Sequence, residues 1–399
     1  MRVGTATMYN LGTGSLLAQQ SEMVKTQQQM ASGRRMVSSG DDPAAAASAL
    51  RTAQSLARNQ RLQENQDAAM TSLAVAESAL GSVADVILAI QDRLVQAQNQ
   101  ALSAAERGIV ASDIESMLDQ LVGLGNTRDA NGAYLFGGFS EATIPFVTTT
   151  AGVVYQGDDG ERKLELAPGR EVAISAPGSD VFMRTRSGNG VFATAAAAGN
   201  TGGGFIDAGS VADPAALDGH AYRLTFNVGG AGTTYDLYDL TAGATVSSGV
   251  PYRPGQATIV AGMQFTISGN PANGDVFTAQ PSVNQSAFKV VADAIAALRG
   301  GGPDAVRWST VNTARASLAQ VADRASAARS EFGARLAEID LHRNVSGAVV
   351  LEHQKRLSEL QDVDYTEAAS RLMRQQTATE AAQQSFAKLA KLSLFNYLG

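Results

Sequence analysis

The first forty residues place an apolar side chain at every seventh position. The alternate positions of this stripe, Thr13, Gln20 and Gln27, are polar or small. A stable coiled coil needs apolar residues at both seam positions of each heptad. Half a stripe buries too little surface to offset the ~1–2 kcal/mol per residue that ordering the backbone costs. We therefore expect residues 1–42 to be loosely ordered in a lone monomer and to need a partner. The apolar positions are Tyr9, Leu16, Met23, Met30 and Val37.

A strict alternation of three and four residues between apolar positions predicts a long helix over residues 43–102. Asp42 is well placed to cap its start, because the carboxylate can accept a backbone hydrogen bond while Pro43 takes the first helical position. No proline follows until Pro145, as an uninterrupted helix requires. A shorter helix is predicted over residues 106–128. The seam positions are Leu73, Ala76, Leu80, Val83, Ile87, Ile90, Leu94, Ala97 and Ala101.

No proline follows Pro303, and this end of the chain predicts a second helical arm. Helix resumes near Ser286, and a glycine–proline break at residues 300–303 precedes another apolar stripe. The last helix leads into an apolar tail at residues 392–398, which a soluble monomer rarely exposes. We expect this tail to be an assembly surface or to be covered by a chaperone. The stripe consists of Leu318, Val321, Ala325, Ala328, Phe332, Leu336 and Ile339, and continues through Val349, Leu357 and Leu360.

The middle of the chain changes to strand periodicity. Residues 153–155 are predicted to form a hairpin with residues 163–166 across an Asp-Asp-Gly turn at 158–160. Residues 186–285 contain 17 glycines, no lysine and no glutamate. Their alternating runs, such as residues 222–226, are typical of half-buried antiparallel strands. This region is expected to be a separate small β domain.

Together these elements predict an α+β fold in which both chain ends build a long antiparallel helical rod or coiled coil. A β-hairpin region and an inserted, mostly β domain accompany the rod. We expect three domains, two of them made from separate stretches of chain. They are a terminal helical assembly domain (1–42 and 355–399), a helical rod domain with hairpins (43–185 and 286–354) and an outward-facing β domain (186–285).

Composition excludes several classes of function. The net charge of −7 argues against non-specific binding of nucleic acid, which needs a basic surface. The absence of cysteine excludes disulfides, thiolate chemistry and cysteine-ligated zinc. The N-terminal stretch lacks the apolar core of a signal peptide, and no segment is expected to be apolar enough to span a membrane. We expect no membrane insertion, and export that depends on a different signal stays open.

Few residues suggest catalysis or metal binding. Asp41 and Asp42 could form a metal or acid–base pair, but their position before Pro43 favours a helix cap. Asp362 and Asp364 lie on different faces of a helix, which favours solvated or intersubunit roles. The sequence has no His-Glu-x-x-His motif and no Gly-x-Ser-x-Gly elbow, and its two triple-glycine stretches lack the ending of a phosphate loop. We predict no enzymatic activity, no cofactor and no metal site.

The three histidines are not expected to act together. His342 and His353 are separated by 11 residues, which places them about 16 Å apart along a helix, too far to share a metal. His220 is expected to stand alone at the start of a strand. The insert has one histidine and no glutamate, so it is poorly equipped for hydrolysis and we expect it to pack or to decorate.

Motifs at both ends of the chain resemble those of the flagellin superfamily. Near the N-terminus these are Gln-Gln-Met-Ala-Ser-Gly-Arg-Arg at residues 28–35 and Asp-Asp-Pro-Ala-Ala-Ala at residues 41–46. Near the C-terminus, residues 362–369, 382–388 and 392–398 are similar to the branch that forms the hook–filament junction. The resemblance covers both helical arms, and the insert matches no named pattern.

Filament flagellins are the nearest alternative within the superfamily. They tend to begin with an Ile-Asn-Thr-Asn type sequence and to end in a Leu-Ser-Leu-Leu type tail. This chain has Met8-Tyr9-Asn10 and ends in Phe-Asn-Tyr-Leu at residues 395–398. The resemblance therefore favours the junction branch.

The resemblance implies a secreted structural subunit of the bacterial flagellum, which follows hook-associated protein 1 onto the hook and presents a surface on which flagellin polymerises. Copies would form a ring in the flagellar tube, after export by the flagellar type III route without a cleaved signal peptide. A cytosolic export chaperone would first cover the C-terminal arm. We expect the assembly contacts to be Leu16, Met23, Met30, Leu372, Phe386, Leu389 and Phe395, and the chaperone contacts to be Leu389, Leu392 and Phe395.

Two other functions stay open. The chain could be the bulk flagellin of a filament or, from another class, a secreted coiled-coil adhesive or glycan-binding protein. A glycan site would use Tyr222, Tyr235, Tyr238 and Tyr252 of the insert. Tyrosines on alternate strand positions are more typical of cross-strand packing.

Overall fold

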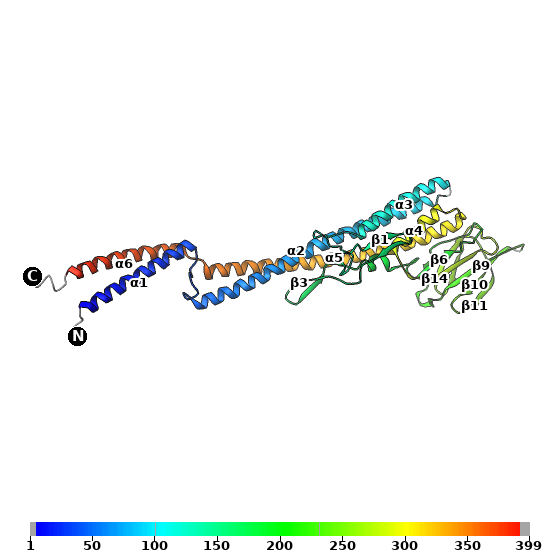
Figure 1. Cartoon of the computed structure of the whole chain (residues 1–399). Coiled ribbons are helices and arrows are strands. Elements are labelled where there is room, and N and C mark those ends of the chain that lie inside the picture. Colours follow the sequence, from blue (N-terminus) through cyan, green and yellow to red (C-terminus); the bar gives the residue numbers. More distant parts are fainter. Residues whose placement is uncertain (1–4, 100, 231, 392–399) are drawn as a thin grey trace, which may run out of the picture. The chain divides into compact units, whose positions relative to one another are not determined.

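The computed structural model describes residues 5–99, 101–230 and 232–391 of the chain. Two compact units make up the chain: a first unit of residues 1–64 and 343–399, and a second unit of residues 65–342. In Figure 1 the elements of both units are labelled and coloured in the order of the sequence, from blue at the N-terminus to red at the C-terminus. Two long helices, α2 (Pro43–Ala97) and α5 (Asp304–Gln361), contribute residues to both units.

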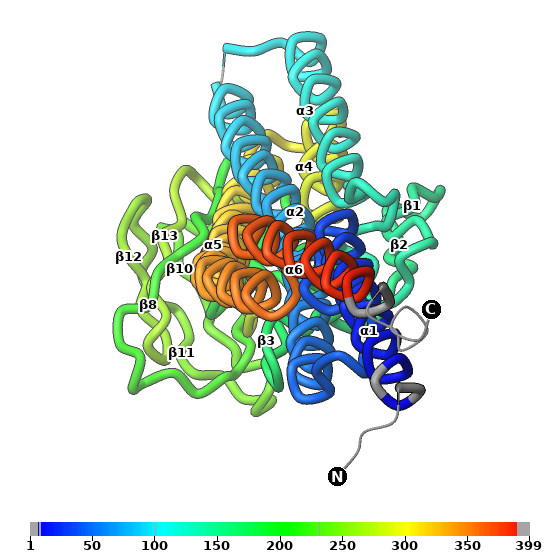
Figure 2. Tube along the Cα trace, turned by 90° about the vertical axis from the view of Figure 1, so that its left-hand side faces the viewer, coloured from blue at the N-terminus to red at the C-terminus, as the bar shows by residue number. Residues whose placement is uncertain are grey.

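The first unit combines helices from the two ends of the chain. α1 (Thr5–Ser32) lies antiparallel to α6 (Tyr365–Lys391), and Figure 2 shows the two side by side. The rings of Tyr9 and Phe386 are 4.9 Å apart near one end of the pair. At the other end the Val363 amide donates to the Gly33 carbonyl at 3.0 Å. The rest of the unit is the start of α2 and the end of α5.

The helices of the second unit enclose a continuous apolar core. The predicted α2 seam is buried from Leu73 to Ala97, whereas Ala101 lies beyond the helix and is exposed. α2 ends before residue 102 because a capping box begins the next helix, α3 (Ala104–Gly125). In that box the Ser103 amide donates to Glu106 Oε2 at 2.7 Å. α4 (Ala287–Arg299) and the α5 residues Leu318, Val321, Ala325, Phe332 and Ile339 complete the core.

Two short β-hairpins pack on this core. β1 (Phe146–Thr149) pairs with β2 (Gly152–Tyr155), and β3 (Lys163–Ala167) pairs with β4 (Arg170–Ala173). The predicted pairing of residues 153–155 with residues 163–166 is therefore wrong. The Asp158 carboxylate accepts from the Phe139 and Gly160 amides at 2.9 and 2.8 Å. These bonds hold the 158–160 turn against an earlier loop, so it separates the two hairpins instead of closing one.

Four phenylalanines anchor the hairpin region to the helices. The Phe146 ring lies 5.1 Å from the rings of both Phe182 and Phe288, and Phe136 lies 5.8 Å from Phe182. All four side chains are almost completely buried. Aromatic pairs in such tilted and edge-on arrangements add to the burial of their large apolar surfaces. The hairpins therefore depend on this aromatic cluster for their position.

The insert is an all-β domain with its own core. Its larger antiparallel sheet has the order β11-β10-β9-β14-β6, and a smaller sheet contains β12, β13 and β7, with β8 also paired to β13. Phe192, Phe226, Phe265 and Phe277 fill the core. The π-helical turn η1 (Ser179–Met183) precedes the insert and packs in the helical core. The elements that follow are β5 (Thr185–Arg186), β6 (Phe192–Ala196), β7 (Phe205–Ile206), β8 (Ser210–Val211), η2 (Pro214–Ala216), β9 (Tyr222–Gly229), β10 (Gly232–Asp239), β11 (Ala244–Pro251), β12 (Ala257–Val260), β13 (Met263–Ser268), β14 (Val276–Pro281) and β15 (Asn284–Gln285), which pairs with β5.

Buried hydroxyl groups on α5 hold the insert to the helices. Ser309 Oγ accepts from the Ile206 amide at 3.1 Å, and Ser317 Oγ accepts from the Gly188 amide at 2.8 Å. Both serines are buried. Removal of either hydroxyl would leave a buried amide without its partner, which costs about 1–3 kcal/mol.

One helix has the length and hydropathy of a membrane span, contrary to the expectation that no segment does. α2 contains an 18-residue window with a mean hydropathy of 1.8, of which 39% is buried. The seam from Leu73 to Ala97 accounts for this composition, because those residues form part of the apolar core of the second unit.

The predicted α+β class, with helical regions from both chain ends and a central β-rich domain, is confirmed. The compact units divide at residues 64 and 342. The three predicted domains, by contrast, were defined by their roles in assembly, and their limits stay a prediction.

Candidate assembly surface

The α1–α6 seam is the set of less exposed side chains with which the two terminal helices face each other. On both helices these positions alternate by three and four residues, as in a coiled coil. About half of them are polar or glycine. The seam consists of Gly12, Leu16, Gln19, Met23, Thr26 and Met30 on α1 with Gly33 directly after it, and of Ala368, Leu372, Gln375, Thr379, Ala382 and Phe386 on α6.

The structure brings five of the predicted assembly residues together in this seam. The antiparallel register set by Tyr9 with Phe386 and by Gly33 with Val363 puts Met23 level with Leu372. Gly12 allows a close approach, because a Cβ there would lie 2.8 Å from the Phe386 ring. The five are Leu16, Met23, Met30, Leu372 and Phe386. The side chain of Leu389, and Leu392 and Phe395 as a whole, fall outside the described part of the chain.

The polar half of the seam differs from the sequence prediction. Gln20 and Gln27 are exposed, and the alternate seam positions are Gln19 and Thr26. A heptad leaves two choices, three or four residues after each apolar position, and both are polar in this segment. Only the pairing with α6 decides between them.

Two seam glutamines make the helix pair weak. The Oε1 atoms of Gln19 and Gln375 are buried and have no hydrogen-bond partner. The register puts these two residues nearly level, one on each helix. A buried acceptor without a partner costs about 1–3 kcal/mol. The buried Thr26 and Thr379 hydroxyls bond only within their own helices, so they add nothing across the seam.

The outward faces of the first unit carry large apolar side chains. Leu11, Leu17, Leu351 and Met373 are each 67–68% exposed. Scattered surface apolar residues are normal, but this unit carries them on all of its helical segments, while about half of its own seam positions are polar or glycine. The surface is thus better suited to contact with other chains than to a solitary monomer.

The turn between α1 and α2 uses both of its aspartates for local hydrogen bonds. Asp42 Oδ1 accepts from the Ala45 amide at 2.9 Å, and α2 begins at Pro43. Asp41 accepts from the Ser38 amide at 3.0 Å and pairs with Lys25 at 2.9 Å. The backbone bond from Ser38, followed by the Lys25 contact, lowers the pKa of the Asp41 carboxyl. The carboxylate oxygens of both aspartates thus stabilise the turn and the start of α2.

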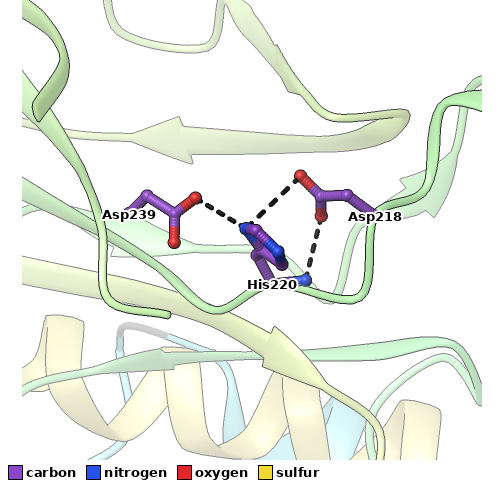
Figure 3. Close-up of side chains that lie close together, drawn as sticks. All are labelled: Asp218, His220 and Asp239. Atoms are coloured by element: carbon purple, nitrogen blue, oxygen red, sulfur yellow. Dashed lines mark hydrogen bonds and ion pairs between the residues drawn. The ribbon is translucent and has the colours of Figure 1, made fainter. Parts of the chain in front are cut away.

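His220 does not stand alone, and that expectation is wrong. Figure 3 shows it between two aspartates: Nδ1 is 2.7 Å from Asp239 Oδ2 and 3.8 Å from Asp218 Oδ2. β9 and β10 pair Tyr222 with Asp239, which brings the end of β10 next to the turn that precedes β9. The hydrogen bond to Asp239 raises the pKa of His220, and the bond from the Ala242 amide lowers the pKa of Asp239.

This cluster is the group of three His and Asp side chains, among the described residues, that lie close enough to hold a metal ion. Its oxygens already have protein partners. Asp218 accepts from the His220 amide at 2.9 Å and from the Tyr222 hydroxyl, and Asp239 accepts from the Ala242 amide at 2.8 Å. The hydrogen bonds of this cluster therefore connect the turn that precedes β9 to the turn that follows β10.

The tyrosines considered for glycan binding mainly serve packing. Tyr222 is 4% exposed. Tyr235 and Tyr252 lie with their rings 5.8 and 5.0 Å from that of Phe226. The Tyr238 ring is covered by the Arg223 guanidinium at 5.0 Å.

Comparison with known proteins matches both ends of the chain to one family. Residues 3–141 match the bacterial flagellin N-terminal helical region, and residues 309–398 match the bacterial flagellin C-terminal helical region. The flagellar hook-associated protein 3 of Escherichia coli is 25% identical over 395 residues, 99% of each chain. That of Salmonella typhimurium is 31% identical over 182 residues, which cover 46% of this chain and 57% of the relative.

Solved structures agree with these relatives. The crystal structure of Xanthomonas campestris FlgL matches with a TM-score of 0.70 and 31% identity, and the match covers 77% of this chain and 99% of FlgL. Hook-associated protein 3 of Legionella pneumophila matches with a TM-score of 0.71 and 28% identity, over 77% of this chain and 98% of the relative. The chain therefore belongs to the flagellin family and, within it, to the hook-associated protein 3 (FlgL) group.

Proposed function

We propose that this flagellar structural protein joins the hook to the filament as a subunit of the flagellar tube. The α1–α6 seam is the observation that carries the proposal. Both chain ends meet in one helical pair, yet about half of its facing positions are polar or glycine, and Leu11, Leu17 and Met373 are exposed beside it. Such a pair gains stability when neighbouring copies cover its apolar outer face. The helix pair would therefore reach its full stability only in the assembled tube.

The proposed partners follow from this position in the flagellum. Hook-associated protein 1 would contact the chain on the hook side, flagellin on the filament side, and further copies of the chain within the ring. The relatives are named as hook-associated proteins, which supports a place next to the hook.

A weak seam also suits secretion through a narrow export channel. Ends that order only on assembly can pass the channel unfolded and do not polymerise early in the cytosol. We infer that a cytosolic chaperone takes up Leu389, Leu392 and Phe395 as an amphipathic helix in a groove until export. In this interpretation the protein is extracellular and leaves by the flagellar type III route.

Deletion of the gene tests the junction role. Electron microscopy should show hooks without filaments, and flagellin should appear in the medium. The full chain supplied in trans should restore filaments, whereas a chain without residues 1–40 and 360–399 should not. Normal filaments in the deletion strain would refute the proposal. Missing filaments without free flagellin would favour the bulk flagellin alternative.

Two single substitutions distinguish the role of the seam from that of the exposed face of α1. Met23→Glu places a charge inside the seam, and Gln27→Glu places the same charge on an exposed position one turn away. We expect Met23→Glu to abolish complementation and Gln27→Glu to keep it. Equal activity of the two variants would show that the seam is not used in assembly.

A further inference from the structure

The two compact units carry opposite net charges. Residues 1–64 and 343–399 contain 14 lysines and arginines against 10 aspartates and glutamates, a net charge of +4. Residues 65–342 contain 17 against 28, a net charge of −11. Copies of this chain are therefore attracted to each other where the first unit of one meets the second unit of another.

Unpaired positive charge in the first unit lies at a groove between α2 and α5. This arginine groove has a volume of about 380 Å³ and is lined by Arg51, Arg356 and His353. In the described part of the chain, neither arginine has a carboxylate within ion-pair distance, and Arg51 makes only a 3.5 Å hydrogen bond to Ser48 Oγ. The remaining lining residues are Ser48, Thr52 and Ser55. The Thr52 hydroxyl donates to the Ser48 carbonyl at 3.0 Å, so the hydroxyls that can donate to a ligand are those of Ser48 and Ser55.

The chemistry of this lining suits carboxylates. Guanidinium groups bind carboxylates with two parallel hydrogen bonds, and the serine hydroxyls of the lining can donate further bonds. Two arginines on facing helices can take two carboxylates held close together. Because the second unit carries a net charge of −11, the second unit of a neighbouring copy is the favoured source of these carboxylates.

One hairpin of the second unit presents two carboxylates side by side. Glu165 and Glu171 are direct cross-strand partners on β3 and β4, and both are exposed. Like charges directly opposite each other destabilise a strand pair. The basic residues of the hairpin do not relieve this repulsion: Arg170 pairs with Glu338 instead, and Lys163 forms no ion pair with either glutamate among the described residues. The hairpin therefore gains from a cationic partner.

We propose that the arginine groove of one copy binds Glu165 and Glu171 of a neighbouring copy in the assembled ring. The contact rests on the proposed function, because it needs copies packed side by side. It would set the register between neighbours, since an ion pair of fixed geometry is satisfied in one relative position, whereas apolar faces tolerate sliding.

Engineered cysteines test this contact directly, because the chain has none of its own. A full-length chain with Ser55→Cys and Glu171→Cys should give a ladder of disulfide-linked multimers when isolated flagella are oxidised mildly. Either cysteine alone can give a dimer at most. Ser55→Cys with Asp119→Cys, an exposed position on α3, is the matched control and should give no ladder.

Charge exchange tests the same pairing without cross-links. Arg51→Glu with Arg356→Glu should reduce the number of filaments about tenfold or more, and so should Glu165→Arg with Glu171→Arg. All four changes in one chain should restore assembly. Arg58→Glu with Arg61→Glu, which makes the same charge change on exposed positions of α2, should leave it nearly unchanged. Normal assembly of the first variant, or no rescue by the fourfold variant, would overturn the proposal.

Failure of this contact can be told apart from failure of the junction role. A ladder in flagella of a strain whose filaments do not depend on the chain would refute the junction role and keep the groove contact. Filaments that depend on the chain, together with no ladder, would refute the groove contact alone.

Discussion

Replacing the two seam glutamines with leucine should strengthen the α1–α6 pair. In the native chain Gln19 Oε1 and Gln375 Oε1 are buried without a hydrogen-bond partner. Each such acceptor costs about 1–3 kcal/mol, and a leucine at the same place buries apolar surface instead. Because some of this gain is lost to imperfect packing, we expect the double variant to stabilise the pair by about 2–4 kcal/mol.

Hydrogen exchange of the isolated full chain measures this gain. A stabilisation of ~2–4 kcal/mol lowers the open population of the pair by a factor of roughly 30 to 1,000, since 1.4 kcal/mol corresponds to a factor of ten. Amides of α1 and α6 should therefore exchange more slowly by that factor, while those of the aromatic cluster in the second unit should not change. Gln20→Leu with Gln376→Leu, at exposed neighbouring positions, is the control and should have little effect.

The same variant also tests why the seam is weak. If assembly requires the pair to open and exchange contacts, a stronger pair in the monomer should slow export or incorporation, and fewer cells should carry filaments. Unchanged or faster exchange in α1 and α6 would refute the assignment of the glutamines to the seam. Slower exchange with normal filaments would refute the idea that weakness serves assembly.

Three further predictions concern other parts of the chain. Because the folded-state pKa of His220 is raised above its ordinary 6.5, its pairing with Asp239 stabilises the insert below that pH and stops doing so as the pH rises through the folded value. His220→Gln should thus lower the melting temperature of the insert at pH 6 and have little effect at pH 9, and an equal loss at both would contradict this. Phe146→Ala should cost about 3–5 kcal/mol in urea unfolding of the second unit, against less than ~0.5 kcal/mol for the exposed Phe139→Ala. Asp42→Ala should cost ~0.5–2 kcal/mol and speed hydrogen exchange in the first turn of α2, and unchanged exchange there would remove its role as a cap.

The long helices could be predicted because their seams are strongly apolar. From Leu73 to Ala97 every predicted position is buried, since large side chains spaced by three and four leave one stable orientation. The end of α2 could not be placed as well. There the capping box at Ser103 competes with continuation of the helix, and the last predicted seam residue, Ala101, has too small a side chain to decide the outcome.

Contacts between residues that are distant in the sequence could not be predicted from the pattern of hydrophobic and polar positions. The Asp-Asp-Gly run at residues 158–160 has turn chemistry, but only the fold shows that Asp158 binds an earlier loop and does not close a hairpin. His220 and Asp239 are 19 residues apart, and it is the register of β9 and β10 that brings them together. A sequence gives the chemistry of each side chain without the strand register that selects its partner.

A weak seam and a charged groove complement each other physically. Apolar faces such as those around Leu17 and Leu351 can supply most of the free energy of assembly, but they favour many relative positions almost equally. Ion pairs between exposed groups add little free energy, yet they penalise every position in which a charge faces an apolar or like-charged surface. Under the proposed function, in which the chain stays open before export and then joins a tube in one register, it needs both. It follows that salt should disturb the register of neighbouring copies before it dissolves their apolar contact, because screening acts on the ion pairs and not on burial.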